Sequence, residues 1–239
     1  MDELLRADVA LSCRILASTG AGDLIWGHVS ARSADGRGIW LKQARYGLEE
    51  ISPDLVHLVN WDGEVLEGGG QRHSEYAIHT EMMKRRSDVG AVVHVHSRHA
   101  VALAATGQEL LPVSHEANFF APLGVPRFDH TTDLILTPEL GHAVAEATGH
   151  AAAVFLVNHG IVCVGADVAS ATIAAVMLER ASAQQLLTWS GGGVPTWTDR
   201  DESLRKREHI YSDVAISDAW AYLARSLSPM PANPNKQRD

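Results

Sequence analysis

The sequence predicts an α/β protein in which helices cover both faces of a central, mostly antiparallel sheet. Apolar runs of strand length meet at two tight turns, Asp62-Gly63 and His159-Gly160, and such turns join antiparallel strands. Helical segments interrupt these hairpins without the regular strand-helix-strand alternation of a doubly wound parallel sheet. The chain also lacks the Gly-x-Gly-x-x-Gly and Gly-Lys-Ser/Thr motifs of nucleotide-binding folds.

The first half of the chain alternates between helical and strand-like periods. The first helix has apolar residues at helical spacing, and Gly20 and Gly22 end it. Ser74 is in a position to cap the second helix. Helices are predicted at 2–18, 75–86 and 100–106, and strands at 38–42, 55–61, 64–66 and 91–96.

The second half continues the pattern. Thr137 and Pro138 are the cap and first residue of a predicted helix at 138–148. Strands follow at 154–158 and 161–165, then a long helix from Asp167 to about 189 and a charged helix at about 199–223. We expect one domain over residues 1–227 and a disordered Pro- and Asn-rich tail at 228–239.

Composition excludes several classes of protein. Hydrophobic residues make up 46% of the 239 residues, as in ordinary globular proteins. Twenty Lys and Arg stand against 29 Asp and Glu, a net charge of −9, so we expect no binding to nucleic acid or to a membrane. Two cysteines and the absence of a leader or a long apolar run predict a cytoplasmic protein. Thirteen histidines are the unusual feature.

The pair His94 and His96 lies in a predicted strand. Alternate residues of a strand share a face, which places their Cα atoms roughly 6.5 to 7 Å apart. Two buried imidazoles need partners, and a divalent metal ion serves both. The pattern by itself is equally consistent with two hydrogen-bonded polar residues at the end of a strand.

Two more residues could complete a metal site. His159 lies in a turn between two strands, where ligands tend to converge, and Glu75 lies at the start of a helix. Three imidazoles and one carboxylate suit Zn, Mn, Co, Ni or Fe. A cupin-like site also begins with His-x-His, but it needs a carboxylate within a few residues, and the next glutamate after His96 is Glu109.

Four segments together resemble a known family, the class II aldolases and adducins. They are Gly27–Arg32 (Gly-His-Val-Ser-Ala-Arg), Ser74-Glu75, Ala91–His96 and Leu156–Gly160. The similarity extends from about residue 5 to 225. It implies a three-layer α/β/α fold of the class II aldolase type.

The resemblance also implies the cofactor and the assembly. One divalent metal per subunit, zinc first and manganese, cobalt or iron as alternatives, would be held by His94, His96 and His159. Glu75 would be the acid/base and could also ligate the ion. A homotetramer would place the sites at subunit interfaces, where Tyr211 or Tyr222 of a neighbour could complete them.

The sequence departs from the sugar-phosphate aldolases of this family where they bind phosphate with Asn, Ser-Gly and paired Ser. It has instead His28, the segment 41–46 that includes Lys42 and Arg45, and His73 before Ser74. Cations and imidazoles suit a substrate that carries carboxylates. The sequence is therefore more similar to family members that decarboxylate hydroxylated aromatic dicarboxylates such as 3,4-dihydroxyphthalate. Lys42 and Arg45 could equally be solvated surface charges.

The expected activity is that of a metal-dependent carbon-carbon lyase acting on a small carboxylated molecule. Glu75 would transfer the proton, with His115 in reserve; His28, Lys42, Arg45, Ser74 and Tyr222 would contact the substrate. One alternative is an aldolase that cleaves a sugar phosphate or a hydroxy-keto acid. Another is a non-catalytic, adducin-like interaction module.

Overall fold

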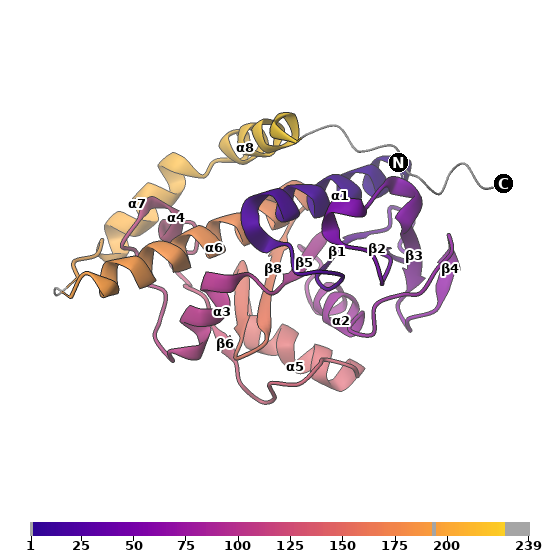
Figure 1. Cartoon of the computed structure of the whole chain (residues 1–239), viewed down its shortest axis with the longest axis horizontal. Helices are drawn as coiled ribbons and strands as arrows, with labels where there is room; N and C mark the ends of the chain where they lie inside the picture. Colours follow the sequence, from indigo (N-terminus) through magenta and orange to yellow (C-terminus); the bar gives the residue numbers. More distant parts are fainter. Residues whose placement is uncertain (1, 193–194, 228–239) are drawn as a thin grey trace.

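A central sheet of eight strands crosses the computed structural model, which describes residues 2–192 and 195–227 (Figure 1). Across the sheet the order is β4-β3-β2-β1-β5-β8-β7-β6, and every described pair is antiparallel except β6 with β7. The strands are β1 (His28–Arg32), β2 (Gly38–Lys42), β3 (Val56–Asn60), β4 (Val65–Glu67), β5 (Ala91–Val95), β6 (Arg127–Phe128), β7 (Ala153–Leu156) and β8 (Gly160–Gly165).

Helices cover both faces of this sheet. Consecutive strand residues point to opposite faces, so Val93 belongs to the core under the first group of helices and Val92 to the core under the second. The predicted three-layer α/β/α fold is therefore confirmed. The first group is α1 (Asp2–Leu16), α3 (Arg98–Ala105) and α6 (Val168–Ser190), and the second is α2 (Ala77–Arg85) and α5 (Pro138–Thr148).

Three helices lie further from the sheet. The short α4 (His115–Asn118) packs on α6, and α7 (Arg200–Ile210) packs on α4. The last helix, α8 (Asp213–Ser226), lies along the outer side of α6 (Figure 1). No helix of residues 2–192 and 195–227 is long and apolar enough to span a membrane.

Helix caps explain why several predicted boundaries agree with the structure. The Thr137 side chain accepts a hydrogen bond from the N–H of Leu140 at the start of α5. Asp167 accepts one from Ser170 at the start of α6. Each satisfies a backbone donor that the helix cannot pair internally.

Other local predictions are wrong. Ser74 does not cap α2, because residues 74–76 form a turn and the helix begins at Ala77. The helix expected at 199–223 is two helices, since Tyr211 leaves helical geometry and Ser212 caps α8. Strands β1 and β6 were not predicted. The tail predicted at 228–239 lies outside the described residues, and one domain over 1–227 stays a prediction.

Replacing Gly141 by alanine should lower the free energy of unfolding by about 1–3 kcal/mol, the usual cost of overpacking. A β-carbon on Gly141 would stand 2.5 Å from the carbonyl oxygen of Ala77, so α5 and α2 would have to separate. Urea denaturation measures the change. Gly69→Ala is the control, because a β-carbon there meets nothing within 4 Å; equal midpoints for both variants would contradict the prediction.

Candidate metal centre

The antiparallel sheet brings the predicted histidines to one end of three adjacent strands. His28 is the first residue of β1 and lies opposite His94, near the end of β5. His96 follows that end directly, and His159 precedes the start of β8. Because β5 is antiparallel to β1 and to β8, the start of each neighbour lies beside its end.

Glu75 lies at the centre of this group, in the turn before α2. Its Oε1 is 3.5 Å from His159 Nε2, and its Oε2 is 3.8 Å from His94 Nε2 and 4.0 Å from His28 Nε2. The ligand atoms of His94, His96 and His159 all lie within 4.8 Å of one another. These separations are too long for hydrogen bonds, but two ligands of a tetrahedral ion at about 2.1 Å stand about 3.4 Å apart.

Hydrogen bonds set the orientation of two of the imidazoles. His94 Nδ1–H donates to the carbonyl of Ile161 at 3.0 Å, and His96 Nδ1 bonds the Asp23 carboxylate at 2.8 Å. The Nε2 atom of each ring is then the acceptor, and it points into the group. Partners of this kind hold metal-ligating histidines in the required tautomer.

The unpaired nitrogens fit a metal ion. The buried Nε2 atoms of His94 and His96 and both ring nitrogens of His159 have no hydrogen-bond partner among the described residues. Leaving a buried polar atom unpaired costs about 1–3 kcal/mol, and one cation can offset that cost for one nitrogen of each of the three rings. The residues present therefore match a divalent cation.

The rings are also in the protonation state that a metal requires. Burial and the neighbouring imidazoles hold the pKa of His94 well below its usual value. Burial, with His96 nearby, lowers the pKa of His159 to about 4. Neutral imidazoles are available at neutral pH, and only the neutral form can donate its lone pair to a cation.

Gly160 lets these rings approach the turn that carries His159. A β-carbon there would lie 2.8 Å from His96 Cδ2 and 3.0 Å from His94 Cε1. The Asn-His-Gly sequence therefore contributes one histidine of the candidate centre and, at the next position, the space that the rings of two others occupy.

Glu75 has the environment of a proton donor as well as that of a ligand. Burial raises the pKa of its carboxyl group, although the N–H of Ile135 donates to Oε1 at 2.8 Å. A raised pKa keeps a proton on a carboxyl group closer to neutral pH.

Beyond His28 lies a buried polar chain that includes Lys42. The Lys42 side chain is 0% exposed, and its ammonium donates to His73 Nε2 at 3.2 Å and to the carbonyl of Ile25 at 3.3 Å. Burial lowers the pKa of Lys42 to about 8. The alternative that Lys42 is a solvated surface charge is therefore wrong. The His73 ring in turn lies against that of His28, with 4.4 Å between centroids.

The other predicted substrate residues are not brought into this group. Arg45 is exposed, in left-handed backbone with φ 73°, and Ser74 is exposed in the turn before Glu75. His115 is exposed at the start of α4, and Tyr222 is 61% exposed on α8. Within the described parts of the chain, no hydrogen bond or ion pair joins these four side chains to the histidines.

Several nearby residues were not found from the sequence. Asp23 and His79 lie 73 and 51 residues from the histidines that they bond, so no local spacing could reveal them. A pocket of about 530 Å³ beside His96 is lined by Asp23, Arg98 and Arg180, among others. Arg98 lies two residues after His96. This short spacing is the sequence feature that could have indicated its place beside the histidines.

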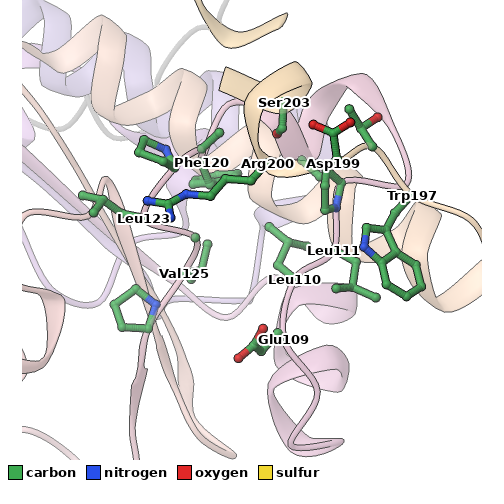
Figure 2. Close-up of a pocket in the computed structure, with 17 residues that line it drawn as sticks. Glu109, Leu110, Leu111, Phe120, Leu123, Val125, Trp197, Asp199, Arg200 and Ser203 are labelled. Carbon is green, nitrogen blue, oxygen red and sulfur yellow. The ribbon is translucent and has the colours of Figure 1, made fainter. Parts of the chain in front are cut away.

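A second pocket is separate from the candidate metal centre. Figure 2 shows this pocket, of about 430 Å³, with Glu109, Leu111, Phe120 and Trp197 around it. None of the described residues of the histidine group lines it.

Comparisons with known proteins agree with this architecture. Residues 7–186 match the family described as Class II Aldolase and Adducin N-terminal domain. An L-fuculose 1-phosphate aldolase from Glaciozyma antarctica PI12 has the same fold, with a TM-score of 0.83 and 22% identity over 93% of this chain and 88% of that one.

The relatives are named for different reactions. A 3,4-dihydroxyphthalate decarboxylase of Arthrobacter keyseri is 30% identical over 79% of this chain and 80% of its own. Another, of Rhodococcus jostii (strain RHA1), is 31% identical over 83% and 85%. An L-ribulose-5-phosphate 4-epimerase of Salmonella paratyphi C (strain RKS4594) is 29% identical over 77% and 84%. The chain belongs to the class II aldolase and adducin family.

Replacing Asp23 by asparagine should weaken metal binding by about 10–100-fold, the usual effect of removing a carboxylate behind a ligating histidine. Zinc titration in competition with a chelating dye measures the affinity. His94→Ala should abolish tight binding. Asp35→Asn is the matched control, because Asp35 is exposed and pairs with Arg37; an Asp23→Asn affinity equal to this control would show that the Asp23–His96 contact does not support the ion.

Proposed function

We propose that this family member is a metal-dependent carbon-carbon lyase that decarboxylates a hydroxylated aromatic dicarboxylate such as 3,4-dihydroxyphthalate. One observation carries the proposal: three imidazoles with unpaired nitrogens converge on a carboxyl group whose pKa is raised. The two decarboxylases at 30% and 31% identity support the choice of substrate class.

His94, His96 and His159 would hold the metal ion, with Glu75 within reach as a further ligand. When bound, a divalent ion supplies the positive charge that stabilises the electrons left behind as a carbon-carbon bond breaks. Zinc is our first choice, and manganese, cobalt and iron remain alternatives, since imidazole and carboxylate ligands suit all of them.

Glu75 would supply the proton. As carbon dioxide leaves, the electron pair of the broken bond stays on the ring carbon, and the Glu75 carboxyl group protonates that carbon. Burial raises the pKa of this carboxyl group and so favours its protonated form. His115 is exposed and is not joined to Glu75 in the described part of the chain, so a reserve role for it requires a neighbouring subunit.

Lys42 would contribute to recognition of the negatively charged substrate. Its buried ammonium pairs with no carboxylate of the described residues; its described hydrogen bonds go to His73 and a carbonyl. A substrate dicarboxylate beside His28 and His73 would offset that charge, and such pairs are strong where water is excluded. Arg98 offers a second cation at the pocket beside His96.

We also propose a homotetramer with sites at subunit interfaces, in the cytoplasm. In that assembly the exposed His115 and Tyr222 of one subunit could reach the site of another. Within the described part of one subunit, no hydrogen bond or ion pair joins either residue to the centre.

A sugar-phosphate aldolase or epimerase is the second candidate, supported by the relative named as a 4-epimerase. Buried His28, Lys42 and His73 lie around the centre of this chain, and imidazoles and a cation suit a substrate that carries carboxylates. In a non-catalytic adducin-like module, nothing would explain why these imidazole nitrogens are buried and unpaired.

The metal-loaded protein should release carbon dioxide from 3,4-dihydroxyphthalate, and Glu75→Gln should reduce turnover by about 10²–10⁴-fold while keeping the fold. Glutamine retains the shape but cannot donate the acidic proton. A parallel assay should follow aldehyde release from sugar phosphates. Rapid aldehyde release without carbon dioxide would favour the aldolase, and near-normal turnover of the glutamine variant would exclude Glu75 as the proton donor.

Lys42→Met should raise the dissociation constant for the aromatic dicarboxylate by an amount equivalent to at least about 2 kcal/mol, because the charge is desolvated. Arg45→Met is the control, and its effect should stay below about 1 kcal/mol, since Arg45 is exposed. Calorimetry on both variants measures the difference. Equal effects would remove Lys42 from substrate recognition.

A further inference from the structure

A second chain of hydrogen bonds joins Ser30 and His28, both in β1, through His79 of α2. His28 Nδ1 lies 2.6 Å from His79 Nε2, and His79 Nδ1 lies 2.6 Å from Ser30 Oγ. His28 and Ser30 are alternate residues of β1, so their side chains share a face, and His79 reaches them from α2. All three side chains are buried.

The direction of this chain follows from the number of donors. A neutral imidazole carries one N–H, and the burial of both rings opposes the charged form that would carry two. If the Ser30 hydroxyl donates to His79 Nδ1, then His79 Nε2–H donates to His28 Nδ1. The remaining proton of His28 is then on Nε2, the nitrogen that faces Glu75 at 4.0 Å.

The opposite direction would leave a donor unpaired. His79 Nδ1–H would then donate to Ser30, and the Ser30 hydroxyl proton would need another acceptor. The described residues give Ser30 no other side-chain hydrogen bond, and an unpaired buried donor is unfavourable.

We propose that Ser30 and His79 are positioning residues that hold His28 in the Nε2–H tautomer, so that His28 donates a hydrogen bond to an acceptor oxygen of the substrate beside Glu75. The inference rests on the proposed function for the identity of the substrate, whereas the tautomer is a property of the protein itself. The acceptor would be a carboxylate or phenolate oxygen, since both bind strongly to an N–H donor.

His73 lies beside His28 and does not compete with His79 for the Nδ1 atom of His28. Its Nε2 faces the Lys42 ammonium, which has protons to donate, so it is an acceptor there. Its ring lies against that of His28 at a 46° tilt. His73 therefore restricts rotation of the His28 ring and leaves its Nδ1 to His79.

Ring-¹⁵N NMR of the full-length, zinc-loaded protein with labelled histidine tests the tautomer directly. The His28 signals are assigned by their loss in the His28→Asn variant. We expect a protonated Nε2 and an unprotonated Nδ1 in the wild type. A protonated Nδ1 would overturn the proposal, and this result does not depend on activity.

Variants test the two positioning residues. Ser30→Ala and His79→Leu should reduce the Nε2–H preference and weaken binding of phthalate, measured by calorimetry, by about tenfold or more, the range for a hydrogen bond to a charged group. His79→Gln, which can still donate an N–H, should restore much of the binding. Thr80→Val is the matched control, because Thr80 is buried on the same helix and its hydroxyl has no partner among the described residues.

The outcomes separate this proposal from the proposed function. An Nε2–H tautomer that persists unchanged in Ser30→Ala and His79→Leu would overturn the role of these residues. A protein that shows the expected tautomer and its loss in the variants, but neither binds phthalate nor releases carbon dioxide, would retain the positioning role and overturn the substrate assignment.

Discussion

The antiparallel pairing of β5 with both of its neighbours decides where the histidines of the candidate centre lie. Because β1 and β8 each run opposite to β5, the first residues of both lie beside its last. His28, His94, His96 and His159, from three separate parts of the sequence, thus meet at one end of the sheet. The turn before α2 adds Glu75 from the adjacent layer.

Burial then determines the chemistry of the group. Imidazoles that would titrate near neutral pH in water are kept neutral, while the carboxyl group beside them holds its proton more tightly. The rings differ in the hydrogen-bond partner of their Nδ1 atom. This partner is a backbone carbonyl for His94, a carboxylate for His96 and a second histidine for His28. These outer contacts, rather than residue type, distinguish prospective ligands from a prospective substrate contact.

Short-range patterns in the sequence predicted much of this arrangement. The His-x-His spacing in a strand, the Asn-His-Gly turn and the helix caps Thr137 and Asp167 are local features, and each depends on a few consecutive residues. Together with the family resemblance, they were enough to predict the three layers and the group of ligands that the structure brings together.

What the sequence could not show depends on tertiary contacts. Lys42 is charged and was open to being a surface residue, yet the packing of strand β2 buries it beside His73. Ser74 has the right residue type for a cap, but the chain needs another turn before α2 to bring Glu75 inward. Asp23 and His79 act only through partners on distant segments.

Gly160 gives a way to compare members of a family that includes both enzymes and adducins. A protein can retain all three histidines and still be unable to place them around one ion if residue 160 has a side chain, because that position is filled by the rings of His94 and His96. Conservation of the ligands is therefore an incomplete criterion for a functional centre. The residue that follows the third histidine should be compared together with the three histidines when members of the family are aligned.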